Sequence, residues 1–248
     1  MMLPWARCGK ARPLVSIASL FTIGFAVSAA TLLTTALASP HPPIPASVFS
    51  ADKGIFRILV NGQEAGQEEF QISPSGANWV IRGTSTLKAS HGVTHVNGTL
   101  ELHADGTPAR YEWSTDGQKK ASSTVTFNGT KVSVELRVGN NATPYTQQFT
   151  FNSPSVVVLD NNLYDQYAVL ARLYDWNKQG VQTFSVLVPQ EMTPGNITVE
   201  SLGKQNSGGK QLDELRVKTE DLELDLYLDG GRLMRVVAPD SGAEIIRN

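Results

Sequence analysis

Apolar and polar residues alternate with a period of two over most of the chain after residue 50. Between Thr130 and Val138 every second residue is Val or Leu, and the residues between them are Lys, Ser, Glu and Arg. The same alternation returns between Asp221 and Leu228, where four leucines occupy one set of positions. Successive side chains of a strand point to opposite faces, so this pattern predicts antiparallel strands with one buried and one wet face.

Short Gly-containing turns separate these runs at the spacing of hairpins. Asn-Gly and Asp-Gly pairs favour tight turns because they accept positive φ angles at low steric cost. The pattern predicts a mainly β protein with about a dozen strands, most of them paired with their sequence neighbours. We expect a curved antiparallel meander that forms an open or partly closed barrel. The turn signals are Asn61-Gly62, Asp105-Gly106, Asp116-Gly117, Asn128-Gly129, Gly139-Asn140 and Asp229-Gly230-Gly231.

One segment departs from the alternation and predicts a helix over residues 162–177. The apolar run Ser155–Leu159 is followed by Asp160-Asn161-Asn162, whose side-chain oxygens are suited to a helix N-cap. Apolar residues then recur near a period of 3.6, and Gly180 marks the expected end. We expect this single helix to lie across the curved sheet and to cover its open apolar face.

The first 38 residues have the pattern of a secretory signal peptide. A short basic segment with Arg7, Lys10 and Arg12 precedes an apolar run, and Ala36-Leu37-Ala38 offers a small-x-small cleavage site. We predict cleavage after Ala38 and a periplasmic or secreted protein; the alternative is an uncleaved anchor, the only contact with a membrane that we expect. Residues 39–50 form a Pro-rich linker, and residues 51–248 form a single antiparallel β domain.

The composition narrows the range of functions. The chain carries 21 Lys and Arg against 23 Asp and Glu, so it lacks the basic excess of a typical nucleic-acid binder. Its one Cys excludes an internal disulfide framework and thiolate metal centres. We therefore expect no nucleic-acid partner, no metal and no cofactor.

Motifs for hydrolytic chemistry are missing or lie in the wrong context. The chain has no G-x-S-x-G elbow, and its histidines all precede Ser207, against the order of an α/β-hydrolase triad. Asp240-Ser241-Gly242-Ala243 matches an aspartic-protease tetrapeptide but is better interpreted as a hairpin turn. His91, His95 and His103 lack a nearby acid and are expected on the surface. We predict that the protein is not an enzyme.

Two features inside the predicted sheet are candidates for binding. Glu68 shares a strand face with Phe70 and Ile72, so either it points inward with a shifted pKa or it lies in water at a sheet end. Large apolar residues on the same faces form either plain core or, as the alternative, the lining of an apolar-ligand cavity. The expected lining of that cavity is Phe56, Phe70, Trp79, Trp113, Tyr167 and Leu170.

Three stretches resemble a known group of proteins: VVVLDNNLYDQYAVLARLYDW from residue 156, QTFSVLVPQ from residue 182 and LDLYLDGGRLMRVVAP from residue 224. They resemble uncharacterised exported proteins of Gram-negative bacteria, and they look like N-terminal modules of secreted α/β-hydrolase peptidases. The resemblance implies an open antiparallel barrel with one helix, similar to the periplasmic lipoprotein-carrier fold. These motifs are structural, so the resemblance assigns no catalytic residue.

Two functions of different classes follow from these observations. The first is an exported, non-enzymatic binding module that holds a lipid or another apolar ligand in the concave sheet. The alternative is an accessory domain, related to secreted hydrolases, that packs against a partner protein. An incompletely filled concave face favours the first, and a filled core with an exposed apolar patch favours the second.

Overall fold

The computed structural model describes residues 47–248, apart from 90–91, 118–119, 140–142, 179 and 221. The predicted signal peptide, residues 39–46 of the predicted linker, and His91 lie outside the described residues. The strands in chain order are β1 (Asp52–Val60), β2 (Gln63–Ser75), β3 (Asn78–Ala89), β4 (Gly92–Leu102), β5 (Pro108–Asp116), β6 (Lys120–Asn128), β7 (Lys131–Val138), β8 (Tyr145–Thr150), β9 (Val156–Val158), β10 (Gln182–Val188), β11 (Thr193–Ser207), β12 (Lys210–Lys218), β13 (Glu223–Asp229), β14 (Arg232–Ala238) and β15 (Ala243–Arg247). The helical elements of this part of the chain are α1 (Asp165–Leu173) and the 3-10 turns η1 (Pro189–Glu191) and η2 (Pro239–Ser241).

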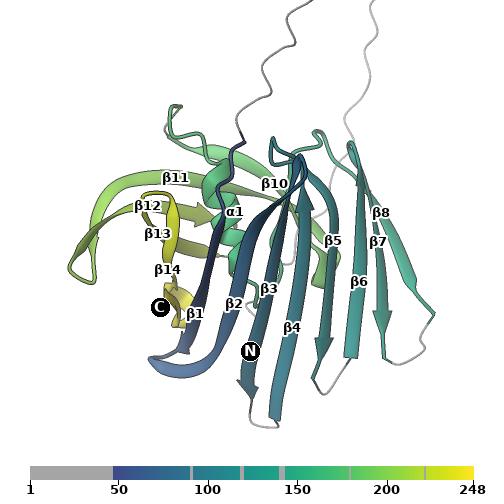
Figure 1. The fold of residues 1–248 in the computed structure, drawn as a ribbon, viewed down its shortest axis with the longest axis horizontal. Coiled ribbons are helices and arrows are strands. Elements are labelled where there is room, and N and C mark those ends of the chain that lie inside the picture. The colour runs from purple at the N-terminus through teal and green to yellow at the C-terminus, as the bar shows by residue number, and fades with distance from the viewer. Residues whose placement is uncertain (1–46, 90–91, 118–119, 140–142, 179, 221) are drawn as a thin grey trace, which may run out of the picture. The chain divides into compact units, whose positions relative to one another are not determined.

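These strands form a single 15-stranded sheet, somewhat larger than predicted (Figure 1). Strands β1 to β8 lie in sequence order on one side, β15 to β9 lie in reverse order on the other, and β1 pairs with β15 in the middle. Neighbours are antiparallel except for the parallel pair β9 and β10. Hydrogen bonds do not close the sheet, because β8 and β9 are its two edges. The prediction of a mainly β, open barrel is confirmed.

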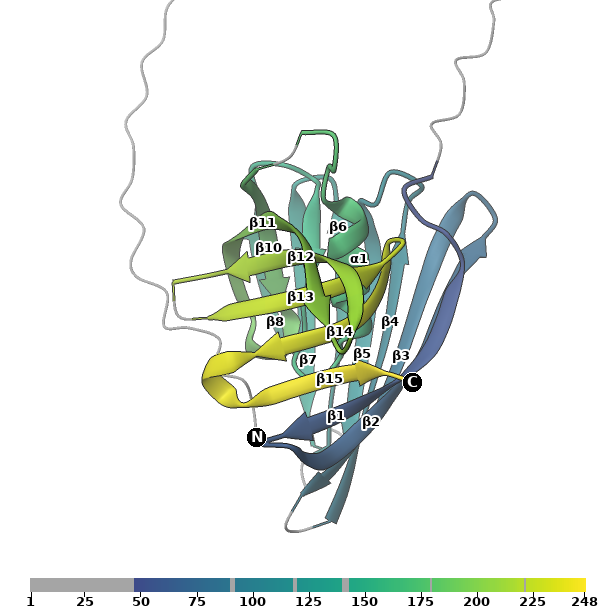
Figure 2. The same cartoon turned by 90° about the vertical axis from the view of Figure 1, so that its left-hand side faces the viewer.

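The alternating pattern of the sequence produces the two faces of the sheet. In β7, Val132 and Val134 are buried in the core, whereas Lys131 and Arg137 are exposed. Figures 1 and 2 show β10–β15 turning across to face the array of β2–β8. The inner faces of both halves enclose one continuous apolar core.

Helix α1 lies between these two halves and contacts β3 and β14. Seven of its nine residues are buried, so it differs from a surface helix with one wet face. The predicted role of this helix, covering the concave face, is confirmed. Its predicted bounds of 162–177 are too wide, because the helix begins at Asp165 and ends at Leu173.

Contacts with distant residues set both ends of α1. The helix has no side-chain cap from its own N-terminal flank, so the predicted capping by Asp160-Asn161-Asn162 is wrong. After Leu173, the backbone of Asp175 bonds to the side chain of Gln182 at both its N–H and its carbonyl, at 3.0 and 2.8 Å. These side-chain hydrogen bonds satisfy the backbone groups of Asp175 that a further helical turn would have used.

The turns that the structure describes occur at the positions that the sequence predicts. Asn61-Gly62 joins β1 to β2 with positive φ angles at both residues, as a tight hairpin requires. The Asp240 tetrapeptide forms the η2 turn between β14 and β15, as predicted. The end of the predicted linker packs against the domain, since Phe49 is buried and its ring centre lies 5.9 Å from that of Trp79.

Candidate functional site

The six predicted lining residues all belong to the one apolar core or pack against it, four from strands and two from helix α1. Phe56 and Phe70 stack with their ring centres 4.7 Å apart, and Tyr167 and Leu170 lie on the buried helix in the same core. Trp113 is buried on β5, and Trp79 is half-buried against the same core. These side chains pack together in the core, and their role as a ligand lining stays a prediction.

The N-terminal end of α1 is held by an acid from a distant strand. Glu68 of β2 is completely buried, and its carboxyl oxygens accept the backbone N–H groups of Tyr164 at 2.7 Å and Asp165 at 3.0 Å. These are the N–H groups that a helix cannot satisfy internally. The inward orientation considered for Glu68 is thus the observed one, and the ligand it binds is the helix itself.

Two carboxyl groups meet beside Gly83 of β3. A Cβ atom at Gly83 would lie 2.8 Å from Asp165 Oδ2 and 2.9 Å from Glu68 Oε1, so only glycine leaves room for both. Burial and the neighbouring Asp165 raise the pKa of Glu68 well above its usual range. Burial also raises the pKa of Asp165, to about 6. Both shifts favour the protonated forms of these carboxyl groups.

Asp160, which precedes the helix, forms the second part of this acidic cluster. Its Oδ2 accepts the Tyr111 hydroxyl at 2.9 Å, and its Oδ1 accepts the N–H of Gln190 at 2.9 Å. Gln166 donates to the same Tyr111 hydroxyl at 3.2 Å. Burial raises the pKa of Asp160 to about 7, against the opposing effect of these hydrogen bonds. Burial thus raises the pKa of all three acids of this cluster, Glu68, Asp160 and Asp165, and Glu68 also accepts the N–H groups at the start of α1.

The C-terminal end of α1 is held by ion pairs instead. Asp52, at the start of β1, accepts hydrogen bonds from Arg247 at 2.7 and 3.1 Å and from Arg172 at 3.1 Å. All three side chains are more than nine-tenths buried, and the Arg247 guanidinium lies 5.2 Å from the centre of the Phe70 ring. Burial alone would raise the pKa of Asp52, but Arg247 and Arg172 lower it below the usual value.

An apolar hollow lies beside this same end of the helix. It has a volume of about 220 Å³ and is lined by Asp105, Gly106, Ser155, Val156, Val157, Leu173 and Phe184. These residues belong to the β4–β5 turn, the edge strand β9 with its flank, α1 and β10. Gly106 permits the close approach of the helix, because a Cβ there would overlap a methyl carbon of Leu173. The hollow is thus located where the sheet ends at β9.

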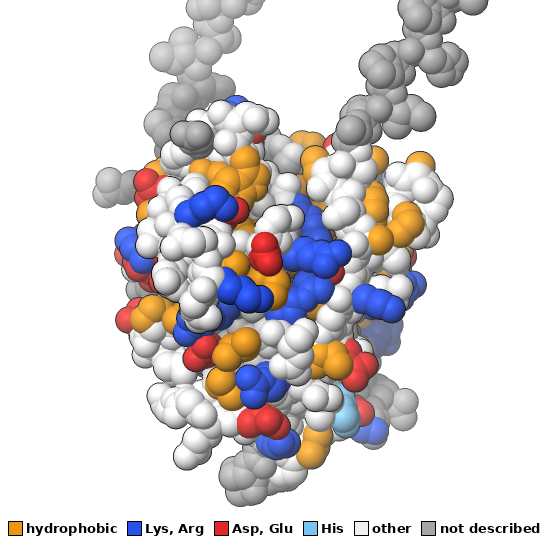
Figure 3. Space-filling model, turned by 60° about the vertical axis from the view of Figure 1, so that its left-hand side comes forward, with side chains coloured by type: hydrophobic (Ala, Val, Ile, Leu, Met, Phe, Trp, Pro, Cys, Tyr) orange, Lys and Arg blue, Asp and Glu red, His pale blue; other side chains and the backbone are white. Residues whose placement is uncertain are grey.

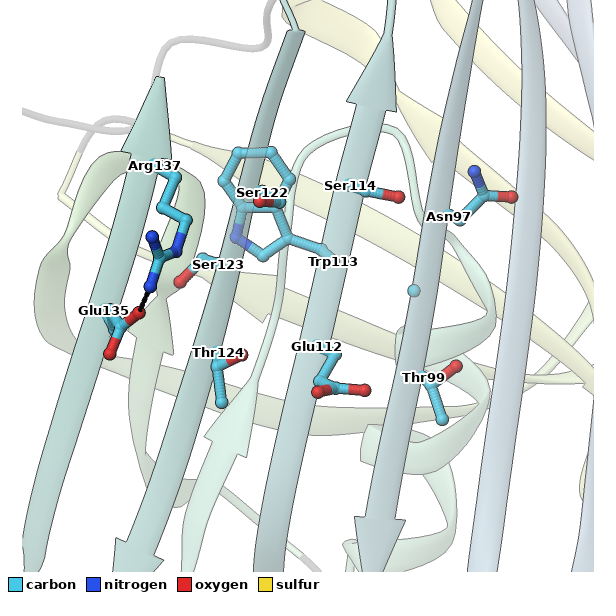
Figure 4. A pocket seen from close by; sticks show the side chains of 11 residues that line it. Asn97, Thr99, Glu112, Trp113, Ser114, Ser122, Ser123, Thr124, Glu135 and Arg137 are labelled. Atoms are coloured by element: carbon cyan, nitrogen blue, oxygen red, sulfur yellow. Dashed lines mark hydrogen bonds and ion pairs between the residues drawn. The ribbon is translucent and has the colours of Figure 1, made fainter. Parts of the chain in front are cut away.

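A larger hollow, of about 370 Å³, lies on the outer, polar face of strands β4–β7 (Figure 4). Nine polar residues line it, and Glu135 and Arg137 form a half-exposed ion pair there. Trp113 is the member of the predicted lining that also borders this hollow. The polar lining is Asn97, Thr99, Glu112, Ser114, Ser122, Ser123, Thr124, Glu135 and Arg137. Its polarity makes it a poor match for an apolar ligand.

On the face shown in Figure 3, Lys and Arg side chains gather near the middle, with acids between them. Charged side chains of the C-terminal strands form ion pairs. Arg216 contacts Asp225 at 2.8 Å, and Arg235 contacts Glu244 at 2.7 Å. Arg235 also borders a hollow of about 320 Å³ between the β11–β12 turn and β14–β15. These four side chains form partly buried ion pairs.

The described histidines do not gather around a metal. His95 contacts Thr86 Oγ1 at 3.1 Å, and His103 contacts Asn78 Oδ1 at 3.4 Å, both on the exposed side of the sheet. In the part of the chain that the structure describes, no group of three His, Cys, Asp or Glu residues is arranged to hold a metal ion. Among the same residues, no helix has the length and hydropathy needed to cross a membrane.

The sequence pattern pointed to Glu68 and gave Asp160 only a capping role, and it assigned no role to Asp52, Asp165 or Arg247. One signal was available, since Asp160 and Asp165 flank apolar residues that the pattern places in the core. Comparisons of the chain with protein-family models, curated proteins and solved structures found no match.

Proposed function

We propose that the protein is an exported, non-enzymatic binding module for a lipid or another apolar chain, which enters at the hollow beside α1 and β9. The observation that carries this proposal is an apolar hollow at the unclosed side of a curved sheet. Val156, Val157, Leu173 and Phe184 supply its apolar walls, and Leu173 belongs to the same buried helix as Tyr167 and Leu170.

The size of the hollow limits the ligand. Pockets that enclose drug-sized molecules measure roughly 300–1,000 Å³. A hollow of about 220 Å³ suits one end of a narrow apolar chain instead of a bulky ring system. The polar residues Asp105 and Ser155 at this hollow would leave the polar end of such a chain near water.

Native mass spectrometry of the purified protein, with organic extraction of bound molecules, tests this proposal. We expect the protein to carry a lipid-sized mass or to take up added tetradecanoate. Ser155→Trp fills the mouth of the hollow and should lower occupancy about tenfold, a loss of about 1.4 kcal/mol. Thr183→Trp is the matched control, because Thr183 is exposed on β10 and does not line the hollow.

A bare polypeptide mass without uptake of added tetradecanoate would contradict the proposal. Equal occupancy in the wild type and in Ser155→Trp would also contradict it, since the ligand would then lie elsewhere. The accessory-domain alternative is tested by the same sample, because it expects a folded protein that takes up no lipid.

A further inference from the structure

The two edges of the sheet are protected very differently. Strand β9 has three residues, all of them buried, and its flank packs into the core. Strand β8 has six residues, none of them buried, and pairs only with β7 among the described strands. An exposed edge strand presents unpaired N–H and C=O groups to any chain that can add a strand.

One hydrogen bond identifies the groups on the free side of β8. The N–H of Phe151 donates to Thr130 O at 2.8 Å, so residue 151 points its backbone groups toward the β7 side. Residues of an antiparallel strand alternate in this respect. Tyr145, Gln147 and Phe149 therefore bond to β7, and Thr146, Gln148 and Thr150 point their backbone groups away from the sheet.

The composition of β8 lacks the usual protection of an edge. Its sequence, YTQQFT, has no charge and no proline, although the chain has 44 charged residues among its Asp, Glu, Lys and Arg. Natural edges are commonly blocked by Lys, by Pro or by a bulge. Because β8 carries no charge, a second copy can approach this strand without like-charge repulsion between the paired residues.

Apolar side chains on the inner face of this edge are left uncovered. Tyr145 is 59% exposed and Val138 of β7 is 57% exposed, whereas Phe149 and Leu136 are half-buried. Pairing with another strand would place further side chains beside Tyr145 and Phe149.

We propose that β8 pairs with β8 of a second copy of this chain, in antiparallel orientation about a two-fold axis through Gln147. This register places outward-pointing Thr146 opposite Gln148 of the second copy. It also places Tyr145 opposite Phe149 of the second copy on the inner face, and such aromatic cross-strand pairs stabilise sheets. The same pairs occur twice, as a two-fold interface requires.

Sedimentation velocity over a range of concentrations tests this dimer. We expect the wild type to shift from one to two chains per particle as its concentration rises. The double variant T146K/Q148K places Lys opposite Lys twice and should stay monomeric. T146K/Q148E places Lys opposite Glu twice and should restore the dimer. Far-UV circular dichroism and the thermal midpoint confirm that each variant is folded.

A wild type that stays monomeric at its highest soluble concentration would overturn the proposal. A dimer that T146K/Q148K leaves intact would also overturn it, because the interface would then exclude β8. Failure of T146K/Q148E to restore the dimer contradicts the proposed register. These outcomes are independent of lipid occupancy, which native mass spectrometry measures separately.

Discussion

The two ends of α1 are both buried, but they are held by opposite chemistry. At the N-terminal end, Glu68, Asp160 and Asp165 are buried together, and neutral donors contact Glu68 and Asp160. At the C-terminal end, a single acid, Asp52, is shared by two arginines. The first arrangement is stable when protons are bound, and the second is stable when the acid is ionised.

The two ends of α1 also differ in whether they border an empty space. The N-terminal cluster lies inside the core, and its acids are each less than 5% exposed. The C-terminal end borders the apolar hollow through Leu173. The acidic cluster thus fixes the position of the helix, and the opposite end offers the space for a ligand.

The largest effect is expected from breaking the ion pairs at the C-terminal end. Asp52→Ala leaves Arg172 and Arg247 buried without their acid, and it should lower the free energy of unfolding by about 3–5 kcal/mol. Urea denaturation measures this loss. The control Glu64→Ala removes an exposed pair with Lys88 and should cost about 0–1 kcal/mol. Similar losses in both variants would show that burial of the Asp52 cluster does not matter.

The pH dependence of stability distinguishes the two ends next. The pKa of Asp160 is about 7 in the folded chain and near 3.8 as an ordinary value, so folding binds its proton more tightly. Stability is therefore lost as pH rises from about 4 through 7, by an amount of roughly 2–4 kcal/mol at one such group. Asp52 has a lowered pKa, so its contribution is present above pH 4 and is lost on further acidification.

Urea denaturation at a series of pH values between 3 and 8 measures this profile. We expect the decline between pH 4 and 7 to become shallower in Asp160→Asn. A stability that rises steadily over that interval in the wild type would contradict the proposed protonation of the cluster.

A methyl group at the N-terminal end should have a smaller effect. Gly83→Ala places a Cβ against the carboxyl groups of Glu68 and Asp165 and should cost about 1–3 kcal/mol of stability. Gly195→Ala is the matched control, because the nearest atom to its Cβ, on Val186, is 3.7 Å away. Thermal unfolding of both variants tests the difference. An equal change in the two midpoints would show that Gly83 is not constrained by the acids.

The smallest predicted effect concerns the hydroxyl that joins Asp160 to Gln166. Tyr111→Phe removes a donor to the Asp160 carboxyl and an acceptor for Gln166, and it should cost about 1–2 kcal/mol. It should also raise the pKa of Asp160 further, because the hydroxyl lowers that value. Carboxyl titration by NMR measures the shift, and an unchanged pKa would contradict the assigned contact.

The strands were predictable because their chemistry is local. Alternation in β7 and β13 and the Asn-Gly turn after β1 each depend on neighbouring residues. The bounds of α1 were not predictable in this way. Its N-terminal N–H groups bond to Glu68, which is 96 residues from Tyr164, and its C-terminal end depends on Gln182. The site was harder still, since Asp52 and Arg247 meet only when the first and last strands of the chain, β1 and β15, pair in the middle of the sheet.

The central claim is that an apolar chain occupies the hollow at the C-terminal end of α1. The most direct measurement is photo-crosslinking of the purified protein with tetradecanoic acid that carries a diazirine at its methyl end, followed by peptide mapping. We predict adducts on the peptides that contain Val156–Val157, Leu173 and Phe184, and loss of these adducts in Ser155→Trp. Adducts confined to the polar outer face around Glu112 and Arg137, or adducts that excess unlabelled tetradecanoate does not reduce, would contradict the claim.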